Sequence, residues 1–131
     1  MAFALGVDGG GTQTRCVVLN ERGDVVGYGV SGASKPDAVE PAVGSRPLQE
    51  AIRTACSTCG GTEVIDSAFL GMGGVISPAD VQVVLNMLTG IEFQPGAPVE
   101  VDLDIRVALA GGTAGQPGIA LIVGTGSSCY G

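Results

Sequence analysis

The sequence contains no tryptophan and no histidine, and aromatic residues make up only 4% of its 131 residues. Because large rings are scarce, the core must be filled mainly by Val, Leu, Ile and Ala, which are typical of a buried α/β sheet. Hydrophobic residues reach 45%, charged residues only 15%, and the mean hydropathy is +0.42. These values argue against a disordered chain and indicate one compact domain with its own core.

Positive charge is also scarce, since the chain has six basic residues, a formal net charge of −7 and a single lysine, Lys35. Nucleic-acid binding needs a basic stripe, so we expect no nucleic-acid partner. A Walker-type phosphate loop needs Gly-Lys followed by Ser or Thr, whereas Lys35 is followed by Pro36. That phosphate loop is therefore excluded.

Long apolar runs are absent too. No stretch of eighteen apolar residues exists, so we expect no membrane span, and the start Met-Ala-Phe lacks the basic region of a secretory signal. The four cysteines (Cys16, Cys56, Cys59 and Cys129) are too few for a disulfide scaffold. Without histidine, Cys56 and Cys59 are better explained by helix packing than by zinc. We expect a cytoplasmic protein with reduced thiols.

The hydrophobic pattern predicts strands and helices in a definite order. We expect three strands at 3–7, 16–19 and 25–30, followed by a loop at 31–44 and a helix from Ser45 to Cys59. A strand at 64–70, a helix opened by Ser77 and Pro78, and a strand at 99–103 come next. The chain then continues with a helix from Asp104 to Leu109, a flexible connection at 111–118 and a strand at 119–123. Three meandering strands followed by helical crossovers predict a mixed five-stranded sheet with helices on its faces.

The first loop that could carry chemistry follows the first strand. It begins at Asp8 and continues as Gly9, Gly10, Gly11 and Thr12. Glycines let the backbone approach a phosphate closely, the threonine adds a hydroxyl donor, and a carboxylate at the strand end can hold Mg²⁺ directly or through water. The loop joins two strands, which does not fit a dinucleotide-binding fingerprint. An ordinary glycine-rich hairpin turn remains the alternative.

Two further segments have the same character. Gly124, Thr125, Gly126 and Ser127 again follow a buried strand directly, as a second phosphate loop would, although a plain turn is also possible. Asp104 stands where a strand passes into a helix, at the strand end that faces the ligand crevice in α/β folds.

Asp104 could take a proton from an attacking hydroxyl, or it could cap the helix, and both roles can hold at once. Asp102 lies two residues earlier on an alternating strand. On such a strand it would share a face with Glu100, so we expect it at the surface and not in the site.

Together these motifs resemble the N-acetylglucosamine kinase and BadF/BadG/BcrA/BcrD-type ATPase family of the actin- and hexokinase-like superfamily. The matching segments are 6–12, 70–74, 104–109, 118–127 and Tyr130-Gly131. The family implies an RNase H-like domain duplicated in one chain, with ATP and substrate in the cleft between the two copies. The resemblance places the first domain at 1–118 and the start of the second at 119–131, so that a longer whole protein is expected.

The resemblance also implies a role for each site residue. Asp8 would position Mg²⁺ and Asp104 would be the catalytic base. ATP phosphates would be bound by Gly10, Gly11, Thr12, Gln13, Gly124, Thr125, Gly126 and Ser127. A sugar or amino sugar would be bound by Ser34, Lys35, Gly73, Asp104 and Thr125. A homodimer is a further possibility.

Three positions depart from the family pattern. Leu103 stands where Asn often precedes the base, Lys35 replaces the Asn of an Asn-Pro pair, and Gln13 replaces a lysine near the phosphate. These changes leave the fold expectation unchanged and leave the acceptor sugar open.

The first functional hypothesis is an ATP-dependent sugar kinase of which this chain is the N-terminal half, inactive alone. The second is an ATPase that drives a 2-hydroxyacyl-CoA dehydratase or benzoyl-CoA reductase. A sugar-binding module without phosphoryl transfer is the third.

Overall fold

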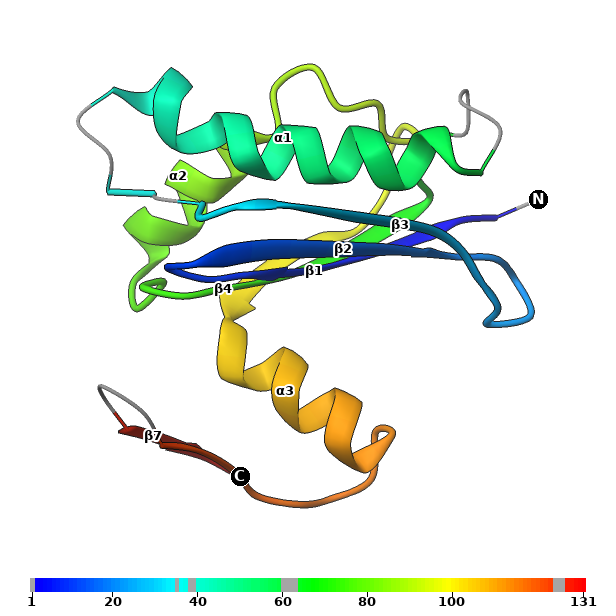
Figure 1. Cartoon of the computed structure of the whole chain (residues 1–131). Coiled ribbons are helices and arrows are strands. Elements are labelled where there is room, and N and C mark those ends of the chain that lie inside the picture. Colours follow the sequence, from blue (N-terminus) through cyan, green and yellow to red (C-terminus); the bar gives the residue numbers. More distant parts are fainter. Residues whose placement is uncertain (1, 35, 38–39, 60–63, 124–126) are drawn as a thin grey trace.

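The computed structural model describes residues 2–34, 36–37, 40–59, 64–123 and 127–131. The chain opens with an antiparallel meander of three strands: β1 (Ala4–Gly9), β2 (Gln13–Leu19) and β3 (Val25–Gly32). Two later strands, β4 (Ser67–Met72) and β5 (Val99–Leu103), add to the other edge of β1 in parallel. The order is β3-β2-β1-β4-β5, which confirms the predicted mixed five-stranded sheet (Figure 1).

Helices cover both faces of this sheet, as predicted. α1 (Pro41–Ser57) and α2 (Pro78–Met87) lie on one face, and α3 (Asp104–Thr113) lies on the other (Figure 1). Strands β1, β4 and β5 run in the same direction, so their carboxyl ends meet at one edge. Loops at that edge form the ligand crevice in folds of this kind.

The first helix begins earlier than the sequence pattern predicts. It starts at Pro41 and not at Ser45, because a proline is favourable at the first helical position, where its missing N–H is not needed. The buried side of α1 consists of Gly44, Leu48, Ala51, Ile52 and Ala55. The predicted loop at 31–44 is therefore too long by six residues, two at the end of β3 and four at the start of α1.

Two glycines of β3 explain how closely α1 approaches the sheet. A Cβ on Gly27 would overlap the carbonyl oxygen of Ala55, and a Cβ on Gly29 would overlap that of Ala51. With only hydrogen atoms at these places, the helix backbone lies directly on the strand. The small helix residues Ala51 and Ala55 are completely buried as a result.

The core lies between α1, α2 and the sheet and is aliphatic, as the composition predicts. Its largest fully buried side chains are Leu48, Ile52, Ile65, Leu70, Met72, Ile105, Val7, Val18, Val84, Thr14 and Cys16. Burial raises the pKa of the Cys16 thiol to about 12, and the neighbouring Cys56 adds to the effect. Cys16 is therefore a protonated core residue at neutral pH.

The C-terminal part differs from the sequence prediction in two respects. Helix α3 continues through Gly111 and Gly112 to Thr113, where we expect a flexible connection. Strands β6 (Ala120–Val123) and β7 (Ser127–Tyr130) form a separate antiparallel hairpin beside α3, and β7 is absent from the sequence prediction (Figure 1). Leu121 and Val123 are exposed on this hairpin.

Across the described part of the chain, no helix combines the length and the apolar character that crossing a membrane requires.

Candidate active site

The loop between β1 and β2 is a tight turn. β1 ends at Gly9 and β2 begins at Gln13, and the Gly10 N–H donates a hydrogen bond of 3.0 Å to the Gln13 carbonyl oxygen. Gly11 and Thr12 are exposed at its tip. The hairpin turn is therefore confirmed, and the phosphate loop stays a prediction that this turn permits, since a hairpin turn can also present backbone to a phosphate.

The turn after β4 is joined to this loop. The Gly73 N–H donates a hydrogen bond of 2.7 Å to the Gly9 carbonyl oxygen. A Cβ on Gly73 would lie 3.5 Å from Oδ2 of Asp104 and 3.8 Å from the Gly10 Cα. The β1–β2 loop, the Gly73 turn and the Asp104 carboxylate therefore meet at one point, at the carboxyl ends of three parallel strands.

Asp104 owes its place to the strand before it and to the packing of α3. β5 ends at Leu103, and Asp104 is the first residue of the helix. Leu103 occupies the cap position, so Asp104 is not the N-cap that the sequence suggests as one alternative. Its negative charge still lies at the favourable end of the helix dipole.

Gly71 allows α3 to approach the sheet at this point. A Cβ on Gly71 would overlap Cγ2 of Val107 and would lie 3.2 Å from the Asp104 Cα. Gly71 therefore determines how near Asp104 comes to the strand ends. The sequence analysis places Gly71 in a matching motif but does not assign it this role, which depends on contacts with a helix 33 residues later.

The charge of Asp104 acts on the Asp8 carboxylate. The pKa of Asp8 is raised, first by burial and then by the negative charge of Asp104, while the positive charge of Arg15 opposes the rise. Two carboxylates that repel one another form a favourable place for a hard divalent cation.

The donor set fits Mg²⁺ better than a metal held by protein alone. Within the described residues, no group of three or more His, Cys, Asp or Glu side chains could enclose a metal ion. Mg²⁺ is usually held by one or two carboxylates together with waters and substrate phosphates. Asp8, with the Asp104 charge close enough to raise its pKa, is the carboxylate that could hold Mg²⁺ in this way.

A cavity of about 190 Å³ opens beside Gly73. Its lining is Pro36, Asp37, Gly73, Gly74, Asp80 and Val83. This is the side on which the family resemblance places the acceptor, and two carboxylates line it. Asp37, Asp80 and Val83 are residues of this wall that the sequence analysis does not single out.

Ser34 is buried behind this wall. Its hydroxyl is hydrogen-bonded to the Thr14 hydroxyl at 2.5 Å, and the Thr14 hydroxyl also contacts the Gly32 carbonyl oxygen at 2.9 Å. This hydrogen bond holds the segment that leads to the cavity. Ser34 itself is not among the residues that line the cavity. Its predicted contact with a sugar stays a prediction.

Several predicted site residues lie outside the described residues, namely Lys35, Gly124, Thr125 and Gly126. Ser127 is the first residue of β7. Gln13 is exposed at the start of β2, and its side-chain oxygen accepts a hydrogen bond of 3.0 Å from Nε of Arg15.

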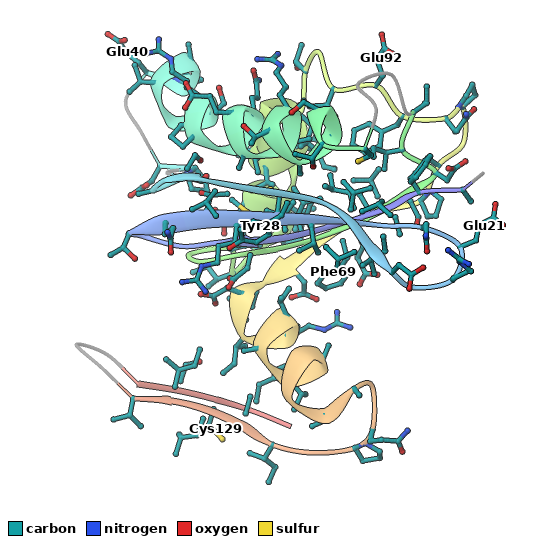
Figure 2. All side chains as sticks on the ribbon, turned by 45° about the vertical axis from the view of Figure 1, so that its right-hand side comes forward. Glu21, Tyr28, Glu40, Phe69, Glu92 and Cys129 are labelled. Atoms are coloured by element: carbon teal, nitrogen blue, oxygen red, sulfur yellow. The ribbon has the colours of Figure 1, made fainter. Side chains whose placement is uncertain are left out.

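Asp102 does not compete with Asp104. Its carboxylate accepts a hydrogen bond of 2.5 Å from Arg106, and that arginine also contacts Glu100 at 3.2 Å. The bond from Arg106 holds the pKa of Asp102 below its usual value. The Arg106 guanidinium lies 5.4 Å from the ring centroid of Phe69, on the α3 side of the sheet (Figure 2). The predicted shared face of Asp102 and Glu100 is confirmed.

The five-stranded sheet with helices on both faces is the RNase H-like fold of the actin-like ATPases and sugar kinases. The family model of the BadF/BadG/BcrA/BcrD ATPase family matches residues 5–131, and the chain belongs to that family.

Two characterised relatives are similar over nearly the whole chain. The N-acetylmuramic acid/N-acetylglucosamine kinase of Clostridium acetobutylicum is 30% identical over 132 residues, which cover 100% of this chain and 42% of that protein. The glucosamine kinase GspK of Vibrio cholerae is 30% identical over 128 residues, which cover 97% of this chain and 42% of that protein.

Solved structures agree with this fold. A Chromobacterium violaceum protein proposed to be an N-acetylglucosamine kinase superposes with a TM-score of 0.70 at 27% identity, over 98% of this chain and 44% of that one. A Porphyromonas gingivalis protein superposes with a TM-score of 0.64 at 21% identity, over 98% of this chain and 43% of that one, and shows the fold alone. The chain thus spans less than half of the length of the relatives that it matches.

Proposed function

We propose that the whole protein is an ATP-dependent sugar kinase and that this chain supplies the catalytic base and the first phosphate loop. One observation carries the proposal, the meeting of the Asp104 carboxylate with the β1–β2 loop at Gly73. Phosphoryl transfer depends mainly on positioning and on charge neutralisation. A base beside a phosphate-binding turn is the arrangement that this chemistry requires.

In this proposal Asp104 accepts the proton of a sugar hydroxyl while the hydroxyl oxygen forms a bond to the γ-phosphorus of ATP. The bond between that phosphorus and the bridging oxygen breaks, and ADP leaves with the electron pair. Gly10, Gly11, Thr12 and Gln13 contact the phosphates. Asp8 is the carboxylate that would hold Mg²⁺, which supplies neutralisation of the phosphate charge when it is bound.

The cavity beside Gly73 is proposed to hold the acceptor. Gly73, which lies against the Asp104 carboxylate, lines this cavity, and the wall also includes Asp37 and Asp80, whose carboxylates can accept hydrogen bonds from sugar hydroxyl or amino groups. The two relatives named above are kinases for N-acetylmuramic acid and N-acetylglucosamine and for glucosamine. An amino sugar is accordingly the acceptor class that we propose.

The rest of the site is proposed to come from a second domain that begins near residue 119. The hairpin β6–β7 and the segment Gly124–Ser127 would open that domain and supply a second phosphate loop. The adenosine pocket and the sugar-facing wall opposite Gly73 would follow. A cytoplasmic location and a homodimer complete this proposal.

The proposal is tested by sugar-dependent ADP release from the full-length gene product, with glucosamine, N-acetylglucosamine, N-acetylmuramic acid and glucose as acceptors. Asp104→Asn keeps the size of the side chain but removes its basicity. We expect sugar-dependent ADP release to fall by about 10²- to 10⁴-fold, the usual contribution of a general base, while ATP binding is retained. Asp102→Asn, on the strand before it, is the matched control and should retain most of the activity.

Two other outcomes would favour the alternatives. ATP hydrolysis without any sugar, together with an iron–sulfur chromophore, would indicate the ATPase that drives a dehydratase or reductase. Sugar binding without ADP release would indicate a binding module. Unchanged activity of Asp104→Asn would contradict the assignment of the base.

A further inference from the structure

Four neighbouring positions of the sheet lie beside the first turn of α3. Phe69 and Gly71 are two residues apart on β4. Their partners in the parallel ladder are Glu100 and Asp102 of β5. Because side chains alternate along a strand, these positions share one face of the sheet. Val107 of α3 packs against Gly71, so this is the face that the helix covers.

Arg106 of α3 contacts the other three positions. Its Nη1 donates hydrogen bonds to Oδ2 of Asp102 at 2.5 Å and to Oε1 of Glu100 at 3.2 Å. Its guanidinium lies 5.4 Å from the ring centroid of Phe69, a distance at which a cation and an aromatic ring attract each other. The hydrogen bond to Asp102 is also the first cause that raises the pKa of Arg106. The helix is thus joined to two strands through one side chain.

The start of α3 lacks a side-chain cap. Leu103 stands at the cap position, and its side chain cannot accept a hydrogen bond from the free N–H groups of the first turn. The Leu103 N–H donates a hydrogen bond of 2.7 Å to Oδ1 of Asp102, whose other oxygen binds Arg106, the third residue of the helix. In a capping box the third residue bonds the N–H of the cap residue directly. Here the carboxylate of Asp102 lies between the two.

We propose that Arg106 is a positioning residue for the proposed catalytic base. By binding β5 and lying over the Phe69 ring of β4, it holds the first turn of α3 against the sheet. Asp104 is the first residue of that turn, so its carboxylate is held at the strand ends together with the turn. The inference rests on the proposed function only for the role of Asp104.

The exposure of these side chains determines where the loss of Arg106 should be seen. The side chains of Arg106 and Asp102 are 35% and 37% exposed, and ion pairs of this kind usually contribute little to the free energy of unfolding. The rate of a reaction is more sensitive, because moving a reacting group by about 1 Å can slow it by about 100-fold. We therefore expect the effect in the catalytic rate and much less in stability.

The test is Arg106→Met in the full-length protein, which keeps an unbranched side chain but removes the charge and the N–H donors. We expect kcat for sugar-dependent ADP release to fall by about tenfold and each KM, for ATP and for the sugar, to change by less than about twofold. A misplaced base weakens the transition state and leaves the binding of both substrates intact. Arg22→Met is the matched control. Arg22 also pairs with an aspartate, Asp24 at 3.3 Å, but at the turn between β2 and β3, so kcat should not change.

Two further variants test the contacts of the guanidinium. Arg106→Lys should recover part of the lost kcat, because an ammonium group still binds carboxylates but lacks the planar surface that lies over Phe69. Asp102→Asn leaves one side-chain oxygen for the guanidinium and does not alter Glu100 or Phe69. This variant should therefore retain most of the activity.

A double variant distinguishes positioning from a general loss of structure. Gly71→Ala also displaces the start of α3. If Arg106 acts on the same displacement, kcat of the variant that combines Gly71→Ala with Arg106→Met should fall by less than the product of the two single losses. Losses that multiply, or a loss confined to KM, would contradict the positioning role.

Hydrogen exchange measures the hold on α3 without any substrate. Peptides that cover residues 103–109 should exchange faster in Arg106→Met than in the wild type, because the amides of residues 107–109 donate to carbonyl groups at the start of the helix. Unchanged exchange, or a kcat equal to that of the wild type, would overturn the inference. If no sugar supports ADP release but exchange is faster, the kinase proposal fails and the hold of Arg106 on α3 stands.

Discussion

Gly71, whose side chain is a single hydrogen atom, sets the position of Asp104, the proposed catalytic base. Gly71 is at the end of β4, and its missing side chain leaves the space that Val107 of α3 fills. Because Asp104 begins α3, any change in the distance between this helix and the strand moves the carboxylate. The position of the proposed base is therefore determined by Gly71, a residue of the neighbouring strand.

Replacing Gly71 should thus reduce the catalytic rate strongly and the free energy of unfolding less. Gly71→Ala would force Val107 to move and would displace the start of α3, and a misplacement of about 1 Å can cost about 100-fold in rate. We expect kcat for sugar-dependent ADP release by the full-length protein to fall by about 10- to 100-fold. Steady-state kinetics and a thermal unfolding curve measure the two effects.

A glycine within α3 itself is the matched control. Gly112 lies inside α3, and nothing lies within 4 Å of a Cβ placed on it. Gly112→Ala should leave kcat unchanged and should stabilise the protein by about 0.5–1 kcal/mol, because alanine loses less backbone entropy in a helix. Equal losses of activity in the two variants would contradict the positioning role of Gly71.

At the scale of single elements, the start of α2 is fixed by hydrogen bonds within its first turn. Ser77 caps the helix, accepting a hydrogen bond of 3.2 Å from the Asp80 N–H, while the Asp80 carboxylate accepts one of 2.9 Å from the Ser77 N–H. This capping box satisfies two backbone donors that would otherwise lack partners. The same turn lines the candidate acceptor cavity through Asp80.

Removing this cap should destabilise the protein. Ser77→Ala is expected to lower the free energy of unfolding by about 1 kcal/mol, as measured by urea denaturation at pH 7. Ser45→Ala, inside α1, is the control: its hydroxyl makes only a bond of 3.3 Å to the Ala42 carbonyl oxygen, so little loss is expected.

The cap should also depend on pH. Hydrogen bonds from the backbone of Ile76, then from the Ser77 side chain, lower the pKa of Asp80 in the folded state. A lowered pKa means that the stabilisation is complete above the usual pKa of an aspartate, about 4, and is lost as the pH falls through the lower folded value. The difference between Ser77→Ala and the wild type should therefore shrink in strongly acidic urea titrations.

Most elements could be predicted from the sequence because their signals are local. Ser77 and Pro78 open α2 as their cap and first-turn preferences predict, and the strand at 99–103 is confirmed. The close packing of α1 against Gly27 and Gly29 could not be predicted, because it joins the helix to a strand that its own sequence does not contain. β7 requires pairing with β6 across a segment that reads as a loop.

In the candidate site, too, some features follow from local sequence signals and others depend on contacts between distant parts of the chain. The loop at Gly10 and the carboxylates Asp8 and Asp104 stand at strand ends that the hydrophobic pattern locates. The convergence at Gly73 depends on the parallel pairing of β1 with β4, between residues about sixty positions apart, and so could not be predicted. The pairing of Asp8 with Arg15 could have been found, because both lie equally far from the turn.

For the molecule as a whole, the core and the hairpin β6–β7 are separate. Every buried hydrophobic residue among those described lies between Phe3 and Ile105. Leu121 and Val123 are 67% and 77% exposed, and Cys129 lies on the same hairpin (Figure 2). The fold of the sheet therefore does not depend on the residues beyond α3.

A chain shortened to residues 1–118 should consequently still fold. We expect one cooperative thermal transition within about 5 °C of that of the 131-residue chain, because no part of the main core is removed. A chain shortened to residues 1–98 removes β5 and α3 and serves as the control that should lose cooperative unfolding. Loss of the transition at 1–118 would contradict the proposed domain boundary.

The central place of β1 has a consequence for how the protein is synthesised. This strand emerges from the ribosome before its partners in the sheet, yet one of its two edges is completed only by β4, and the Phe3 N–H bonds to an aspartate 63 residues later. The meander can form early, since its contacts are local. The open edge of β1 has to wait until Met72 has been added, and during that interval the nascent sheet presents an unpaired strand to other chains.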